Sequence, residues 1–309
     1  MKRKVLHTVI SVILCLASAA LTGCLPLSYL ENMDRQGPAM WIVEDKEGHR
    51  CYLFGTVNAA KSVDMYPFAD VIEDAYSYCG YIAVESDVTK PDDGELTDLY
   101  KYKDGTTVKD HISSETYAAA VEAIKEYEGG YDGKYDDFTA IYWYSLIYNY
   151  NSSLCGYKTE YGSDTYFINK AAGDGKKVVE ITGEKKRAEA LLSLSDTATD
   201  YFIRSALANR GSTALDYYDV IYKEGGTELL ARSVNSGKNA QYGSAALNAA
   251  MSEYYEIMVV QRNKTLAEAV KKALSDGDRV FFALGISQLV GDDGVVSVLQ
   301  SGGCRVVRK

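Results

Sequence analysis

The sequence predicts an α/β protein whose central mixed, largely parallel sheet is built from two related halves. Helices flank this sheet, and a large helical insertion extends the fold. Two observations support this class. Short apolar runs typical of buried strands alternate with longer segments of helical periodicity. In addition, a strand, a crossover helix and a second strand follow one another between residues 50 and 86, a connection that favours parallel pairing.

A hairpin, a helix and a strand are expected first. The stretch MWIVEDKEGHRCYLFGTVN holds two apolar strands, residues 40–43 and 50–54, on either side of a polar turn. A helix is predicted around residues 67–79 because apolar side chains recur there at helical spacing, and Gly80 ends it. The segment YIAVES then forms a buried strand that ends at Glu85.

The middle and the end of the chain continue this alternation. Residues 91–175 and 186–275 have mainly helical periodicity, and the stretch TAIYWYSLIYNY is typical of helix packing. Between these two regions GKKVVEIT, residues 175–182, predicts a short strand. After residue 275 we expect a strand, RVFFAL, a loop, GISQLVG, a helix, VVSVLQSGG, and a last strand, CRVVRK.

The N-terminus is expected to direct export. Residues 1–23 join a basic start, MKRK, to an apolar run, as signal peptides do. The run ends in LTGC, the pattern of a bacterial lipobox, so Cys24 is predicted to carry a lipid anchor in the cell membrane or outer membrane. An ordinary signal peptide or an uncleaved anchor is the alternative. Residues 24–37 follow as a tether, and residues 38–309 form a single domain.

Composition argues against several classes of function. The net charge of −10 disfavours a nucleic-acid partner. The cysteines beyond the predicted lipid site include no CxxC pair, which disfavours a zinc site, and their apolar surroundings favour free thiols over disulfides. Their pairing is left open; they are Cys51, Cys79, Cys155 and Cys304. The sequence also lacks a Walker A loop, a GxSxG elbow and an HExxH motif.

An internal echo indicates where a site lies. RCYLFGTVN resembles RVFFALGISQ, since each has an arginine, an apolar strand and then a glycine followed three residues later by an amide. The motifs run from Gly55 to Asn58 and from Gly285 to Gln288. Glycine allows a close backbone approach or a positive φ at such turns. Because ligands bind at the carboxyl ends of strands in open α/β sheets, the two loops and Glu85 are expected to share one crevice.

These motifs belong to a wider resemblance. The chain resembles the TraB/PrgY/GumN family, which is related to the Tiki proteases. The matching stretches cover nearly the whole domain: PAMWIVEDKEGHRCYLFGTVN, VES, GSDTYFINKAAGDGKKVVEITG, QRNKTLAEAV and RVFFALGISQLVGDDGVVSVLQSGGCRVV. The resemblance implies a Gly-x-x-His motif in each loop and an acid on the strand between them. In a Tiki-like site these groups hold a divalent metal, manganese, cobalt or zinc, that activates water for peptide hydrolysis.

The chain departs from that pattern at both histidines. Asn58 stands where the resemblance places the first histidine, and Gln288 where it places the second. The acid that the family often carries after the middle strand falls at Thr182. The other positions match, namely Glu85 as the acid, Asp164 as a central aspartate, and Arg262 and Asn263 as an Arg-Asn pair.

Loss of both imidazoles changes the expected chemistry. A neutral imidazole binds zinc, manganese or cobalt and transfers protons near neutral pH, whereas a carboxamide does neither well. The domain has two histidines that could replace the missing imidazoles, His49 in the predicted hairpin turn and His111 in a helical region. Neither is expected at the carboxyl end of a strand, so neither is expected to take over this role. No metal cofactor is therefore expected, despite the metal that the resemblance implies.

Three interpretations stay open. In the first, the protein is a pseudoenzyme whose crevice binds a peptide, a glycan or a small ligand. In the second, it is a hydrolase with altered chemistry, in which Glu85 acts as general base and Arg262 stabilises an anion. In the third, these two residues form an ion pair that stabilises the fold. The candidate catalytic residues are Glu85, Arg262 and Asn263, and the candidate ligand-binding residues are Gly55, Asn58, Asp164, Gly285 and Gln288.

Overall fold

The computed structural model describes residues 37–90, 94–210 and 214–309. The predicted signal peptide, the lipid site Cys24 and the tether up to residue 36 lie outside the described residues. Within the described ranges no helix has both the length and the apolar character needed to cross a membrane.

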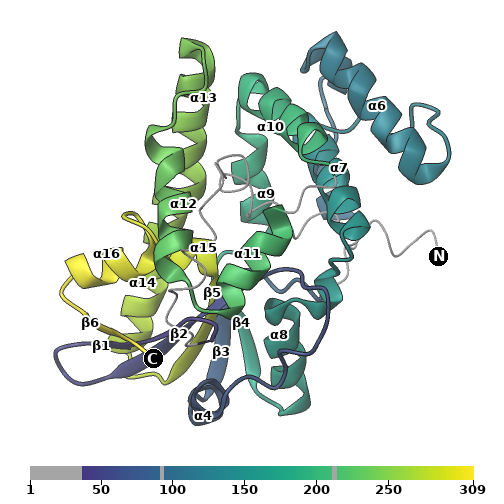
Figure 1. Ribbon diagram of the computed structural model, residues 1–309. Coiled ribbons are helices and arrows are strands. Elements are labelled where there is room, and N and C mark those ends of the chain that lie inside the picture. The colour runs from purple at the N-terminus through teal and green to yellow at the C-terminus, as the bar shows by residue number, and fades with distance from the viewer. Residues whose placement is uncertain (1–36, 91–93, 211–213) are drawn as a thin grey trace.

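One mixed sheet forms the centre of the described structure (Figure 1). Its strand order is β4-β3-β5-β2-β1-β6, and the strands are β1 Met40–Glu44, β2 Arg50–Thr56, β3 Tyr81–Val84, β4 Lys177–Glu180, β5 Val280–Gly285 and β6 Arg305–Arg308. The neighbours from β4 to β2 are parallel, whereas β1 pairs antiparallel with both β2 and β6. The predicted fold class, a mixed and largely parallel sheet flanked by helices, is confirmed.

Helices cover both faces of the sheet because its strands are apolar on both sides. Along β2 and β5, Phe54 and Phe281 face one core, while Leu53 and Phe282 face the other. The first core packs against α4 (Asp70–Tyr78) and α8 (Ser163–Gly173). The second packs against α11 (Ala214–Lys223), α12 (Thr227–Asn239), α14 (Arg262–Ser275) and α16 (Val295–Ser301).

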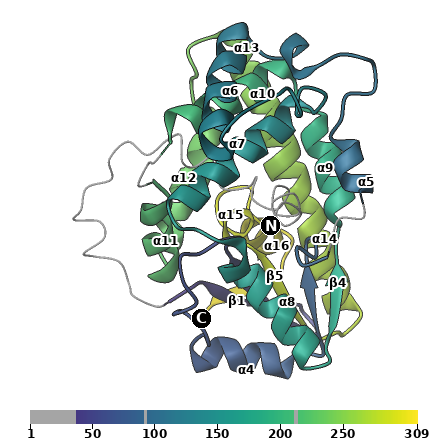
Figure 2. The same cartoon turned by 90° about the vertical axis from the view of Figure 1, so that its right-hand side faces the viewer.

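The helical insertion has a core of its own. Figures 1 and 2 show α6 (Ser114–Glu128), α7 (Ala140–Leu154), α10 (Asp196–Ala208) and α13 (Ala245–Tyr255) gathered on the side away from α4. The tyrosine-rich stretch forms α7, and its Trp143 is fully buried between these helices. The prediction that this stretch serves helix packing is confirmed. Both predicted helical regions contribute to this one core.

Short elements complete the described structure, and one of them corrects a prediction. They are α5 (Glu95–Leu99), α9 (Glu184–Leu192), α15 (Ile286–Leu289), the 3₁₀ helices Val108–Asp110 and Thr159–Tyr161, and a π-helical segment, Glu256–Gln261. The segment GISQLVG was predicted as a loop, but its first part forms α15. The Gln288 side chain accepts a hydrogen bond from the Gly285 backbone N–H at the start of this turn, which stabilises it.

The two echoing segments are neighbours in the sheet. Strands β2 and β5 pair in parallel, with Tyr52 opposite Phe281 and Thr56 opposite Gly285. The two Gly-x-x-amide motifs are therefore offset by one residue. Neither glycine has a positive φ; a side chain on Gly55 would instead lie 2.4 Å from the Ile286 side chain. Close approach, rather than a left-handed backbone, explains glycine at this position.

Candidate functional site

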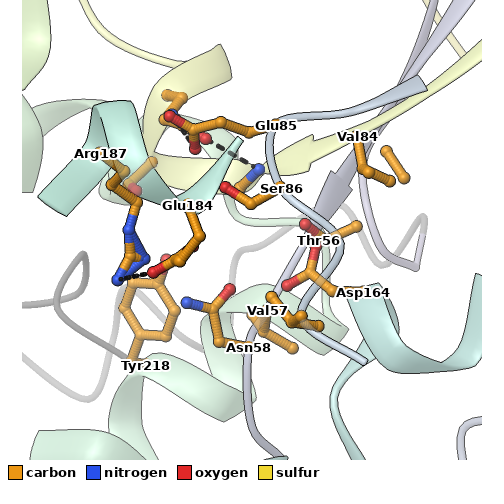
Figure 3. Close-up of a pocket in the computed structure, with 15 residues that line it drawn as sticks. Thr56, Val57, Asn58, Val84, Glu85, Ser86, Asp164, Glu184, Arg187 and Tyr218 are labelled. Atoms are coloured by element: carbon orange, nitrogen blue, oxygen red, sulfur yellow. Dashed lines mark hydrogen bonds and ion pairs between the residues drawn. The ribbon is translucent and has the colours of Figure 1, made fainter. Parts of the chain in front are cut away.

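A polar pocket lies at the carboxyl ends of the parallel strands (Figure 3). The ends of β2, β3 and β5 contribute Asn58, Glu85 and Gln288, which confirms that the three predicted strand ends share one crevice. Helix α8 adds Asp164, and Gly285 also lines the pocket. Further lining comes from α9 and α11, which carry Glu184, Arg187 and Tyr218.

Glu85 is held by two other side chains. The Arg262 guanidinium donates through both Nε and Nη2, one to each carboxylate oxygen of Glu85. The Gln288 amide nitrogen donates to Glu85 Oε2 over 3.1 Å, while its amide oxygen accepts from the Gly285 N–H. The side chains of Glu85 and Arg262 are only 11% and 7% exposed, so this is a buried ion pair. An ion pair between these two residues is what the third interpretation expects.

The environment keeps Glu85 ionised. Burial by itself raises the pKa of a carboxyl, but the charge and hydrogen bonds of Arg262 outweigh burial here and lower the pKa of Glu85 below its usual value. The more distant Arg187 and the Gln288 amide act in the same direction. Glu85 is thus an anion whose two oxygens are already engaged.

The loop that carries Asn58 is fixed by the start of α8. Ser163 Oγ accepts from the Val57 N–H over 2.8 Å, and the Ser163 N–H donates to the Val57 carbonyl over 2.9 Å. Gly162 packs so closely that a Cβ there would lie 2.4 Å from the Asn58 carbonyl oxygen. The sequence Gly-Ser-Asp at residues 162–164 therefore connects the start of α8 to the loop after β2. Glycine permits the close contact, serine holds the loop by hydrogen bonds, and Asp164 lines the pocket.

Asp164 differs from Glu85 in its partners. Its Oδ2 is buried and has no hydrogen-bond partner among the described residues. Burial raises the pKa of Asp164 to about 6, and the nearby negative charge of Glu85 adds to this effect, while a hydrogen bond with the Thr56 side chain and the charge of Arg187 oppose it. Glu85 is therefore neutralised by a neighbouring arginine, whereas Asp164 has no ion-pair partner among the described residues.

This raised pKa predicts a pH-dependent effect of Asp164→Asn. Because the pKa of about 6 exceeds the ordinary 3.8, ionising Asp164 destabilises the fold as pH rises between these values. We expect the variant to gain stability over the wild type from pH 4 to pH 7, by up to about 3 kcal/mol. Urea unfolding at each pH measures the difference. Asp74→Asn, at an exposed position of α4, is the control and is expected to show no such trend; a pH-independent effect of Asp164→Asn would contradict the assignment.

A second ion pair lines the pocket and was not predicted. Arg187 Nη2 lies 3.4 Å from Glu184 Oε1, and the Arg187 side chain is only 4% exposed. The resemblance places an acid at Thr182, but the Thr182 N–H and hydroxyl bind the Glu85 carbonyl. Glu184, two residues further on, supplies the carboxylate on this side of the pocket. Burial raises the pKa of Glu184, and Arg187 partly offsets this rise.

The comparison with known families agrees with this architecture. The model of the TraB/PrgY/gumN family matches residues 39–308. The chain belongs to this family. No match was found among curated proteins or among solved structures. The recognition made from the strand-end motifs is confirmed, whereas the replacement of two family histidines stays a prediction.

Three of the residues carried over from the TraB/PrgY/gumN resemblance do not line the pocket. One is Arg262, which pairs with the lining residue Glu85; the other two are Asn263 and Gly55. Asn263 is fully buried, and its Nδ2 donates to the Asp293 carbonyl over 2.9 Å, in the segment that precedes α16. Gly55 accepts a hydrogen bond from the Tyr222 hydroxyl through its carbonyl. Both positions support the elements that carry site residues.

The two histidines of the domain lie elsewhere. His49 is in the β1–β2 turn, where its Nδ1 lies 2.9 Å from Asp45 Oδ2. This turn precedes β2, so it is at the opposite end of the strand from Asn58. His111 stacks on Tyr102 beside the helical insertion. Neither residue lines the pocket.

The side chains of the pocket do not fit the divalent metal that the family resemblance implies. Both oxygens of Glu85 bind Arg262, and the Gln288 amide oxygen is occupied by a backbone N–H. In the described ranges no three histidine, cysteine or acidic side chains are grouped so that they can hold a metal ion. The nitrogen and sulfur donors that zinc prefers are not among the residues that line the pocket. The four thiols at Cys51, Cys79, Cys155 and Cys304 are free.

Proposed function

We propose that this TraB/PrgY/gumN-family protein binds a peptide, a glycan or a small ligand in the strand-end pocket and does not hydrolyse it. Cys24 carries a lipid that anchors the protein to the cell membrane or the outer membrane, with the domain on the extracytoplasmic side. No nucleic-acid partner is proposed, and the net charge of −10 of the whole chain supports this.

The engagement of Glu85 is the observation that carries this proposal. A general base needs a free lone pair directed at its substrate and a pKa near the working pH. Glu85 meets neither condition, because Arg262 and Gln288 occupy its oxygens and its pKa is lowered. Glu85, held in place by Arg262, forms part of the pocket wall. Other buried polar atoms in the wall remain without partners, as expected for a surface that a ligand completes.

A ligand screen with a parallel hydrolysis assay tests this function. The full chain, purified in mild detergent, is exposed to peptides and glycans while its unfolding temperature and the products are followed. We expect one ligand class to raise the unfolding temperature, because a ligand that binds only the folded state stabilises it. We also expect Asn58→Ala to weaken this effect and no product to form. Asn169→Ala, at an exposed position of α8, is the matched control.

The alternative function, a hydrolase that uses Glu85, predicts a different result. It requires turnover of a ligand by the wild type and loss of that turnover in Glu85→Gln. That outcome would overturn the proposal that the protein only binds. If no ligand in the screen changes the unfolding temperature, the pocket is a structural feature and the binding function is contradicted.

A further inference from the structure

We infer that the pocket recognises the primary ammonium group of its ligand, through Asp164 and the hydroxyl groups beside it. This inference rests on the proposed binding function and specifies the ligand's chemistry. A peptide amino terminus and an amino sugar both carry such a group.

The ion pairs leave a single unpaired charge in the pocket. Glu85 is neutralised by Arg262, and Glu184 by Arg187. Asp164 has no ion-pair partner in the described part of the chain, and burying a lone carboxylate is costly. A ligand that supplies one positive charge at this place removes the cost, whereas an anionic group adds to it.

Acceptor oxygens in the same pocket as Asp164 match the donors of an ammonium group. Thr56 and Ser86 line the same pocket, and their residues are only 1% and 8% exposed. The hydroxyl oxygens of both residues, like Asp164 Oδ2, are buried and accept no hydrogen bond from the described residues. The Thr56 hydroxyl interacts with Asp164 and the Ser86 hydroxyl with Glu184, and each lowers the pKa of that carboxyl. Figure 3 shows Thr56 beside Asp164, on the side of the pocket that faces away from Arg187. A primary ammonium has three N–H donors and no acceptor, so it can donate to the Asp164 carboxylate and to the Thr56 hydroxyl oxygen beside it.

Other ligand groups fit these atoms less well. A neutral hydroxyl group can hydrogen-bond to the oxygens but leaves the Asp164 charge uncompensated. Zinc prefers nitrogen or sulfur donors, which this wall does not offer, and among the described residues no three histidine, cysteine or acidic side chains are grouped to hold a metal ion of any kind. An ammonium provides both the charge and the donors. Its placement depends on Asp164 being ionised, which gives binding a dependence on pH.

The charged and titratable groups around Asp164 come from four elements or loops. They are Glu85 after β3, Glu184 and Arg187 on α9, Tyr218 and Tyr222 on α11, and Tyr66 before α4. Burial raises the pKa values of Tyr66 and Tyr222 well above neutrality, and the lowered pKa of Glu85 keeps this carboxyl ionised. Asp164, with a pKa of about 6, is the group expected to dominate the change between pH 5 and pH 7.

Calorimetric titration of the full chain in detergent tests the inference with four probes. Triglycinamide and glucosamine carry the ammonium; N-acetyl-triglycinamide and N-acetylglucosamine are their neutral counterparts. We expect at least one ammonium probe to bind at pH 7 roughly tenfold or more tighter than its acetylated form. The pair that shows this preference identifies the source of the ammonium. At pH 5 the preferred probe is expected to bind about tenfold more weakly, because Asp164 is then mostly protonated.

Two variants make the test specific. Asp164→Asn is expected to remove the preference for the ammonium form and the pH dependence, while Asp74→Asn, with the same change of charge at an exposed site, retains both. Equal binding of the acetylated probes, or an unchanged preference in Asp164→Asn, would overturn the inference and leave the binding function standing. Absence of binding by all four probes also overturns it, and the binding function then depends on the wider ligand screen.

Discussion

Replacing Arg262 with methionine is expected to lower the free energy of unfolding by about 3–5 kcal/mol. The guanidinium neutralises Glu85 in a place where both side chains are almost fully buried. Without it, the Glu85 carboxylate stays buried, and its remaining side-chain donor among the described residues is the Gln288 amide. Urea unfolding at pH 7 measures the loss. The loss is expected to shrink at acidic pH, because the lowered pKa of Glu85 means that the pair stabilises the fold only while this carboxyl is ionised.

A matched arginine provides the control for this prediction. Arg204 is 55% exposed and pairs with Asp200 one turn away on α10, so Arg204→Met is expected to cost less than about 1 kcal/mol. The double variant Glu85→Gln with Arg262→Met is expected to recover part of the loss, since it removes the uncompensated charge. If Arg262→Met costs no more than Arg204→Met, the ion pair does not have the structural role assigned to it.

Replacing both Asn58 and Gln288 with histidine is expected to create a metal site. Both side chains line the pocket together with two carboxylates that have raised pKa values, Asp164 and Glu184. Two imidazoles at these positions add the nitrogen donors that the wild type lacks. Zinc affinity is expected to rise by more than about 100-fold, since changes in outer partners of a metal site alone alter affinity by about 10- to 100-fold. Calorimetric titration with zinc, manganese and cobalt measures this gain.

The control for this gain is a double variant at exposed positions. Asn169→His with Gln300→His adds the same side chains outside the pocket. Equal zinc affinity in the control and the pocket variant would show that the gain is non-specific. No gain in the pocket variant would contradict the assignment of Asn58 and Gln288 to one former site.

The sheet was predictable from sequence because its strands are short apolar runs with clear boundaries. The hairpin and β5 were both predicted within two residues of their observed limits. The four residues of α15 were not recognised, since no periodicity can develop in one turn. Their helical form depends on the Gln288 side chain and the Gly285 N–H, a contact that sequence spacing alone does not reveal.

Only the site residues that follow a strand or belong to a family motif could be predicted from the sequence. Asn58, Glu85 and Gln288 follow strands, so their convergence was foreseeable. Arg187 and Glu184 lie on a helix after β4, and nothing in the sequence shows that this helix end faces the pocket.

The Arg-Asn pair shows why sequence adjacency does not imply a shared site. Consecutive helical side chains point about 100° apart. Arg262 therefore reaches Glu85 while Asn263 binds the Asp293 carbonyl. A motif of two neighbouring residues on a helix can thus serve two different elements.

The metal content of the wild-type protein tests the central claim most directly. The full chain is dialysed in detergent against excess manganese, cobalt and zinc, and the bound metal is then measured. A pocket whose acid is held by Arg262 and whose strand-end loops carry amides is expected to retain well below one equivalent of any of these metals. One equivalent of metal in the wild type, lost in Glu85→Gln, would contradict the account and restore a metal-dependent hydrolase.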